Sequence, residues 1–264
     1  MTPYKINTSF SYCGDHCLGV ASTSDKSVLD AFFMASSLPR ARKAVVTTGR
    51  GAVSVQAVEI PRPRSDELIV RTVAVGLNPT DWKSLELAPA VGAIIGVDFS
   101  GVVAEVGRDV TKFNVGDRVA GFVHGSVASN HEYGAFSEYV LAFEHLTTAL
   151  PQRMSFDEGA TIGVGITTVG QALGGCLRLP LPVPSPFLAR EGVPGQFILI
   201  YGGQTSTGIL AIQLAKLSGL RVIATCSSNG FDRVKSLGAE QAFDYVCLFC
   251  NMHGIEGLTR PAEE

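Results

Sequence analysis

The stretch Phe197-Ile-Leu-Ile-Tyr-Gly-Gly-Gln-Thr-Ser-Thr-Gly208 decides the fold. Its first five residues form a continuous apolar run of the kind that buried parallel strands require. The glycine-rich turn leads into residues 209–217, whose apolar positions have helical periodicity and which Gly219 would end. A strand that passes through a glycine turn into a helix indicates a phosphate-binding turn, because backbone N–H groups at the helix N-terminus can approach a pyrophosphate.

Two more strands and one more helix follow in alternation. Residues 221–225 form a second apolar run, residues 231–237 have helical periodicity and stop at Gly238, and residues 241–246 form a third strand. A helix between two strands carries the chain back to the starting edge of the sheet, so the strands are parallel. This order predicts the first half of a doubly wound (Rossmann) dinucleotide-binding sheet.

The segment before this sheet predicts a helix and then a surface loop. Residues 157–174 are predicted as one helix, which Ser155 or Asp157 would cap and the pair Gly174-Gly175 would end. Residues 179–187 contain four prolines. Prolines at that density favour an extended, polyproline-like loop on the surface.

Upstream, the sequence changes to short β-branched runs separated by glycine and proline. Such spacing predicts an antiparallel, barrel-like domain. The expected strands are residues 44–48, 53–60, 68–77, 97–106, 118–123 and 136–143. The chain therefore divides into an unassigned segment at 1–38, a barrel-like domain at 39–155, a partial dinucleotide-binding domain at 156–246 and an atypical tail at 247–264. Residues 1–38 are compatible with an extension or with one helix.

Composition excludes several functional classes. Of 264 residues 46 % are hydrophobic, which predicts a globular protein, and 21 Lys and Arg against 24 Asp and Glu give a net charge of -3. We expect no nucleic-acid partner, because no basic face is evident, and no membrane partner, because no apolar run of about 20 residues exists. Without a secretory leader, a cytoplasmic monomer with six reduced cysteines is expected.

The end of the second strand indicates which cofactor the turn would prefer. NAD-binding sites usually place Asp or Glu there, whereas this chain has Cys226-Ser-Ser-Asn229. Hydroxyls and an amide can donate to a 2′-phosphate, with Arg233 or Lys235 within reach, so NADPH is predicted. Two alternatives stay open: a glycine turn that only caps its helix, and a polar loop that only leads into the next one.

Further motifs carry a family resemblance. They are Gly76-Leu-Asn-Pro-Thr-Asp-Trp-Lys83, Gly96-Val-Asp-Phe-Ser-Gly101, Val115-Gly-Asp-Arg-Val119, the glycine turn that follows Tyr201, and Ala224-Thr-Cys-Ser227. Together they resemble the medium-chain dehydrogenase/reductase superfamily, and within it the zinc-independent, trans-acting enoyl reductases of fungal polyketide pathways. The likeness covers about residues 40–246. It implies a GroES-like barrel, and a partner polyketide synthase that presents the substrate on its acyl carrier protein.

The resemblance also implies roles for individual residues. NADPH would deliver hydride to the β-carbon of an enoyl thioester, and the α-carbon would then be protonated. The implied cofactor contacts are Pro79, Thr80, Asp81 and Trp82 from the barrel side, Thr205, Ser206, Thr207 and Gly208 at the pyrophosphate, Ser227, Ser228 and Asn229 at the 2′-phosphate, and Tyr245 at the adenosine. The implied lining of the acyl channel is Ala160, Thr161, Ile162, Gly163, Val164, Gly165, Ile166 and Thr167.

Lys83 is the candidate catalytic residue. As the cation next to the expected nicotinamide edge, it could stabilise an enolate or deliver a proton. The alternative is a solvated surface charge, and Trp82 beside it could be a core aromatic.

No metal is predicted. Catalytic zinc in alcohol dehydrogenases of the superfamily needs a Cys near position 78 and a His in the later glycine motif, where this chain has Asn78 and Val97-Asp98. In the tail, Cys247, Cys250 and His253 are too few ligands for a closed tetrahedral site.

The resemblance stops at Val246, whereas a full doubly wound domain needs about three more strands. We therefore expect a C-terminally truncated cofactor domain. Two functions besides the enoyl reductase stay open: an inactive homologue that binds nucleotide or a protein partner, and a quinone oxidoreductase of the same superfamily.

Overall fold

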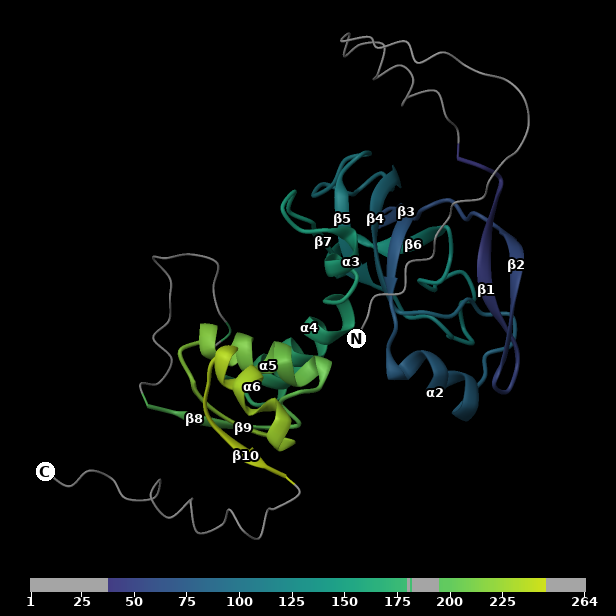
Figure 1. Ribbon diagram of the computed structural model, residues 1–264. Helices are drawn as coiled ribbons and strands as arrows, with labels where there is room; N and C mark the ends of the chain where they lie inside the picture. Colours follow the sequence, from purple (N-terminus) through teal and green to yellow (C-terminus); the bar gives the residue numbers. More distant parts are fainter. Residues whose placement is uncertain (1–37, 180, 182–194, 246–264) are drawn as a thin grey trace, which may run out of the picture. The chain divides into compact units, whose positions relative to one another are not determined.

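The computed structural model describes residues 38–179, 181 and 195–245 (Figure 1). The described chain forms two compact units that divide after Gly163, whereas the sequence suggested a boundary after residue 155. We call residues 38–163 the barrel unit and residues 164–245 the parallel-sheet unit. The predicted N-terminal segment up to residue 37, most of the proline-rich loop and the 247–264 tail lie outside the described residues.

The barrel unit consists of two antiparallel sheets. A hairpin pairs β1 with β2, and a second sheet has the order β6-β3-β4-β5-β7. The strands are β1 (Ala41–Gly49), β2 (Ala52–Glu59), β3 (Glu67–Gly76), β4 (Asp98–Val106), β5 (Arg118–Phe122), β6 (Tyr139–Phe143) and β7 (Thr147–Ala149). The six predicted strands and their antiparallel pairing are confirmed, and β7 was not predicted.

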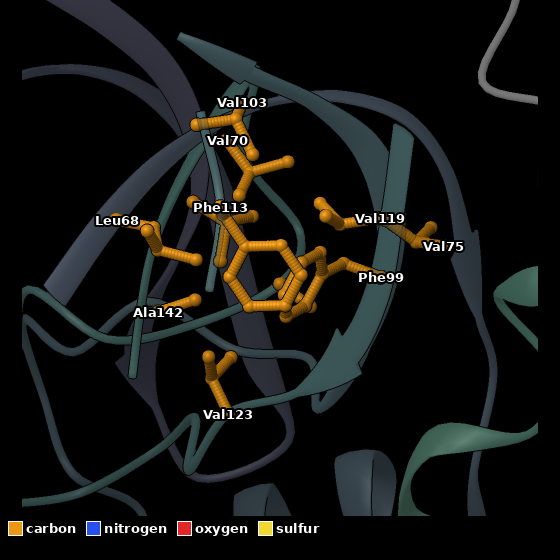
Figure 2. Close-up of a cluster of buried hydrophobic side chains, with 11 residues drawn as sticks. Leu68, Val70, Val75, Phe99, Val103, Phe113, Val119, Val123 and Ala142 are labelled. Atoms are coloured by element: carbon orange, nitrogen blue, oxygen red, sulfur yellow. The ribbon is translucent and has the colours of Figure 1, made fainter. Parts of the chain in front are cut away.

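A cluster of buried hydrophobic side chains, most of them from the five-stranded sheet, forms the core of the barrel unit. Phe99 and Phe113 lie at its middle, among valines contributed by β3, β4 and β5 (Figure 2). Alternating side chains of each strand point to this side, which is why the β-branched runs were legible in the sequence. The cluster consists of Leu68, Val70, Val75, Phe99, Val103, Phe113, Val119, Val123, Ala135, Val140 and Ala142.

Short helices connect these strands. Helix α2 (Pro79–Leu87) follows β3, and α3 (Phe156–Gly159) follows β7, with a 3-10 turn at Glu144–Leu146. Ser155 caps α3 as predicted, since its hydroxyl accepts a hydrogen bond from the N–H of Glu158. Helix α2 was not predicted, although it holds five of the candidate site residues.

The parallel-sheet unit has three strands in the order β10-β9-β8, all parallel. They are β8 (Phe197–Tyr201), β9 (Arg221–Cys226) and β10 (Ala239–Asp244), connected by α5 (Ser206–Leu217), a 3-10 turn (Ser228–Gly230) and α6 (Phe231–Ser236). This order confirms the predicted half of a doubly wound sheet. In Figure 1 helices α4, α5 and α6 lie over one face of the sheet, where Val169, Ile212 and Val234 join one core cluster.

The predicted single helix at 157–174 is wrong. The chain turns at residues 160–162 between α3 and α4 (Gly163–Gly170). At this turn the carbonyl of Ala160 packs so closely on Gly76 that a Cβ on Gly76 would lie 2.3 Å from it. The predicted stop at Gly174-Gly175 is also wrong: α4 widens into a π-helix (Gln171–Cys176), in which the N–H of Leu177 donates to the carbonyl of Ala172. In the described part of the chain no helix is both long and apolar enough to cross a membrane.

Candidate functional site

The glycine turn between β8 and α5 has the geometry of a phosphate cradle. Gly202 has a φ of +78°, which favours glycine. A Cβ on Gly208 would lie 2.2 Å from the carbonyl oxygen of Gly202, so only glycine lets the helix start this close to the strand. The first turn of α5 therefore presents its N–H groups and its positive dipole end beside the end of β8.

Thr205 is the N-cap of α5. Its hydroxyl accepts a hydrogen bond from the N–H of Gly208 at 3.0 Å and donates to the carbonyl of Gly202 at 2.8 Å. The hydroxyl proton that the sequence suggested for a phosphate is therefore committed inside the turn. Ser206 and Thr207 are both exposed in the first turn of α5. The turn therefore caps its helix and also has the geometry of a phosphate cradle, so the two interpretations do not exclude each other.

A polar cluster joins the glycine turn to the end of β9. The hydroxyl oxygen of Ser227 lies 2.7 Å from Oε1 of Gln204 and 2.8 Å from Oδ1 of Asn229. Gln204 packs so tightly on Gly230 that a Cβ there would lie 2.0 Å from it. The structure therefore brings Thr205–Gly208 and Ser227–Asn229 to one edge of the sheet. Gln204 was missed, although it lies within the quoted glycine stretch.

Two more side chains stand at the same edge. Asp244 pairs in register with Cys226. Burial raises the pKa of the Cys226 thiol, and the charge of Asp244 raises it further. Residues 226–229 contain no carboxylate, but Asp244 of the neighbouring strand β10 places one beside Cys226. The sequence analysis did not predict this carboxylate. Tyr245 follows β10, and its ring centroid lies 6.1 Å from that of Tyr201, which is 71 % exposed.

In the barrel unit the candidate residues gather at the start of α2. Asn78 is the N-cap, and its side-chain amide donates to Oδ2 of Asp98 at 2.8 Å. Its backbone N–H donates to Oδ2 of Asp81 at 2.7 Å. Asp81 is buried, and Oδ1 has no hydrogen-bond partner among the described residues. Burial raises the pKa of Asp81 to about 6, against a smaller opposing effect of the Asn78 N–H.

Trp82 and Lys83 point to solvent within this unit. Trp82 is 58 % exposed, which argues against a core aromatic, and the ammonium of Lys83 lies 5.7 Å from its ring centroid. That distance allows a cation–π contact. Lys83 is exposed, as the surface-charge alternative also requires.

The eight small residues at 160–167 divide between the units. Ala160 and Gly163 are buried in the barrel unit, where a Cβ on Gly163 would lie 2.5 Å from Oδ1 of Asp98. Gly165 packs against Leu210 of α5 in the parallel-sheet unit, and Ile166 is 38 % exposed. Val164 and Thr167 are half-buried.

The described residues hold no group of three or more His, Cys, Asp or Glu that could bind a metal ion. Two cysteines lie in the described ranges, Cys176 and Cys226, and both are free. The tail residues Cys247, Cys250 and His253 fall outside those ranges.

Comparison with known proteins places this geometry in a family. Residues 64–152 match the alcohol dehydrogenase GroES-like domain. The trans-enoyl reductase TOXD of Cochliobolus carbonum is 49 % identical over 206 residues, which are 77 % of this chain and 67 % of that protein. The trans-enoyl reductase ACTTS2 of Alternaria alternata is 47 % identical over 206 residues, 77 % of this chain and 58 % of its own length.

Solved structures agree on the fold. The quinone oxidoreductase of Coxiella burnetii superposes with a TM-score of 0.61 at 29 % identity, covering 78 % of this chain and 63 % of that one. The CurK enoyl reductase has a TM-score of 0.64 at 21 % identity, covering 82 % and 64 %. The chain spans about three fifths to two thirds of the length of the curated relatives above. By its sequence and its fold, the chain belongs to the fungal trans-enoyl reductase family of the medium-chain dehydrogenase/reductase superfamily.

Proposed function

We propose that this protein is an NADPH-dependent, trans-acting enoyl reductase, which reduces the α,β-double bond of an acyl thioester carried by a polyketide synthase. The observation that carries the proposal is the 41–49 % identity with fungal trans-enoyl reductases. The aligned lengths exceed either unit alone, so the likeness includes both the barrel and the parallel sheet. Cytoplasmic location, a monomeric state and an acyl carrier protein as the immediate partner belong to the same proposal.

The residues of the parallel-sheet unit fit a dinucleotide. A Cβ on Gly208 would lie 2.2 Å from the carbonyl oxygen of Gly202, so glycine at this position lets the N-terminus of α5 lie directly beside the end of β8. In this proposal the first turn of α5 holds the pyrophosphate through its N–H groups, with Ser206 and Thr207 as hydroxyl donors. Tyr245 contacts the adenosine.

The preference for NADPH rests on the donors after β9. Ser228 and Asn229 offer a hydroxyl and an amide to a 2′-phosphate, and Arg233 on α6 is exposed. Ser227, whose hydroxyl donates to Gln204 in this structure, would have to turn that hydroxyl toward the phosphate. Asp244 opposes this preference, because its carboxylate lies on the strand beside Cys226. A measured ratio of NADPH to NADH affinity decides between the two influences, and we expect NADPH to bind more tightly.

On the barrel side, Pro79, Thr80, Asp81 and Trp82 orient the nicotinamide, and Lys83 acts on the substrate. When bound, NADPH supplies the hydride that adds to the β-carbon, and a proton then adds to the α-carbon. Lys83 stabilises the negative charge that develops on the thioester oxygen, or delivers that proton. The eight residues Ala160–Thr167 line the channel that holds the acyl chain.

An assay of NADPH oxidation, combined with a measurement of cofactor binding, tests the proposal. The purified full chain is mixed with NADPH and a crotonyl-thioester mimic, and loss of NADPH absorbance is followed alongside binding of NADPH and NADH by fluorescence. We expect oxidation of NADPH that depends on the crotonyl group. NADPH binding without oxidation would instead identify a nucleotide-binding homologue without activity. If the protein neither binds nor oxidises NADPH, both functions are contradicted.

Quinone reduction is the second candidate function, because the quinone oxidoreductases of Coxiella burnetii and Pseudomonas syringae match at 29 % and 28 % identity. The same assay separates it from the first. Turnover with a soluble quinone and none with the crotonyl thioester would favour quinone reduction.

A further inference from the structure

Helix α2 lacks the apolar stripe that holds most surface helices. It spans nine residues, and its one buried residue is Asp81. Of its large apolar side chains, Trp82 and Leu87 are 58 % and 79 % exposed and Leu85 is half-buried. A helix this short is marginal without tertiary packing, because nucleation costs more than its few hydrogen bonds return. Something other than hydrophobic burial must fix its place on the barrel unit.

A polar relay anchors the N-terminal end of α2, while near its C-terminal end the N–H of Gly51 donates to the carbonyl of Leu85 at 3.1 Å. Asp98 begins β4 and is 2 % exposed, and its Oδ2 accepts a hydrogen bond from the side-chain amide of Asn78 at 2.8 Å. Asn78 in turn donates its backbone N–H to the carboxylate of Asp81 at 2.7 Å. The relay runs from a sheet strand through the helix N-cap to the first turn of the helix. A hydrogen bond from a neutral amide to a buried carboxylate is stronger than one between neutral groups.

The strand end of the relay is fixed on three sides. Asp98 stands in register with Gly76 of β3 and with Phe122 of β5, so it lies within the sheet rather than at an edge. A Cβ on Gly163 would lie 2.5 Å from Oδ1 of Asp98, so the main chain there packs directly on the carboxylate. The Asp98 side chain therefore has little room to move, and its hydrogen bond holds Asn78 at a fixed place relative to the sheet.

We propose that Asp98, acting through Asn78, is the positioning residue that sets helix α2 on the barrel unit and thereby fixes Trp82 and Lys83. Its consequence for catalysis rests on the proposed function, in which α2 carries the nicotinamide contacts and Lys83. The positioning itself does not depend on cofactor or turnover.

Trp82 gives a direct readout, because it is the one tryptophan of the chain. It directly precedes Lys83 on α2, so its emission and its quenching by acrylamide report the state of that helix. Acrylamide is neutral, so charge changes nearby do not bias the collision. Since Trp82 is already 58 % exposed, loosening of α2 raises the quenching constant by at most about 1.7-fold.

The test is an exchange of the two partners. Asn78→Asp sets a carboxylate against Asp98, and the repulsion between a half-buried and a buried carboxylate should release α2. Asp98→Asn replaces the charged acceptor by an amide of equal size and should have a smaller effect in the same direction. The double variant N78D/D98N restores one amide and one carboxylate with reversed polarity. We expect increased Trp82 quenching in both single variants and a return to the parent value in the double variant.

Asp117→Asn is the matched control. Asp117 accepts a hydrogen bond from the N–H of Asn114 with the same three-residue spacing, but at an exposed turn far from α2 in the sequence, and Trp82 quenching should not change. Parent-like quenching in N78D, or a double variant no better than N78D, would overturn the proposal. If a single variant fails to fold, circular dichroism and size-exclusion of the double variant decide in the same way: recovery supports the relay and persistent loss overturns it.

Discussion

Asp81 and Asp117 make the same local contact in different surroundings. Each accepts a hydrogen bond from the backbone N–H of the asparagine three residues earlier, at 2.7 and 2.8 Å. Asp117 does so at the surface, whereas Asp81 is 8 % exposed, and burial raises its pKa to about 6. The same sequence pattern therefore occurs once at the surface and once in a buried place, and at Asp81 burial disfavours the charged carboxylate.

The first prediction concerns the pH dependence of stability. Between the ordinary pKa of 3.8 and about 6, folded Asp81 binds more protons than unfolded Asp81, so its contribution to the free energy of unfolding falls as pH rises through this window. Asp81→Asn removes that loss while keeping an oxygen acceptor. Relative to the parent, the variant should gain up to about 2 kcal/mol between pH 4 and pH 7, after a discount for residual solvent.

Denaturant unfolding monitored by Trp82 fluorescence measures this difference, with Asp117→Asn as control. Parallel pH profiles of the parent and Asp81→Asn would rule out the raised pKa.

The second prediction concerns Lys83. If this ammonium stabilises the developing enolate or supplies a proton, Lys83→Met should lower kcat by about 100-fold, in the usual range for a general acid, and leave the Kd for NADPH within about twofold. Lys112, which is exposed elsewhere in the barrel unit, gives the control Lys112→Met. Steady-state kinetics and a fluorescence titration supply the two numbers. An unchanged kcat in Lys83→Met removes this residue from the mechanism.

At the scale of elements, periodic segments were predictable and polar ones were not. The six barrel strands and the order of the parallel sheet followed from alternating and continuous apolar runs, because each run buries one face or both. Helix α2 has no such run: proline begins it and its buried residue is Asp81. The π-helix was misread because Gly174-Gly175 has the composition of a stop, while the i to i+5 hydrogen bond of Leu177 depends on tertiary context.

In the candidate site, too, the residues that follow strands were predictable and the contacts between distant residues were not. Thr205–Gly208 and Ser227–Asn229 were identified from their places after strands, and they do lie at one edge of the sheet. The contact of Gln204 with Ser227 and the pairing of Asp244 with Cys226 join residues about 20 positions apart. A single sequence carries no signal for such tertiary pairs.

The third prediction tests the glycine cradle as an element. In Gly208→Ala the new Cβ would lie 2.2 Å from the carbonyl of Gly202, so the turn must open and the first turn of α5 must move. NADPH affinity should fall by at least about tenfold, which corresponds to 1.4 kcal/mol. Isothermal titration measures it.

The control is Gly170→Ala at the end of α4, where nothing lies within 4 Å of the added Cβ. Alanine there should keep NADPH affinity and raise the free energy of unfolding by up to about 1 kcal/mol through helix propensity. Equal NADPH affinity in the two variants would show that the cradle does not hold the pyrophosphate.

At the scale of the whole molecule, the chain combines a GroES-like unit with three parallel strands in the order that begins a doubly wound sheet. The 206 aligned residues, 77 % of this chain, span 67 % and 58 % of the two trans-enoyl reductases compared above. The residues present therefore establish family membership, and the reductase activity is what the experiments test.

The most direct test of the central claim follows the hydride. The full chain is incubated in ordinary water with NADPH deuterated at the transferable position and a crotonyl-thioester mimic, and the saturated product is analysed by mass spectrometry and NMR. We expect one deuterium at the β-carbon and ordinary hydrogen at the α-carbon, formed at a rate above that of Lys83→Met. Product formed no faster than without protein, or product without deuterium at the β-carbon, would contradict it.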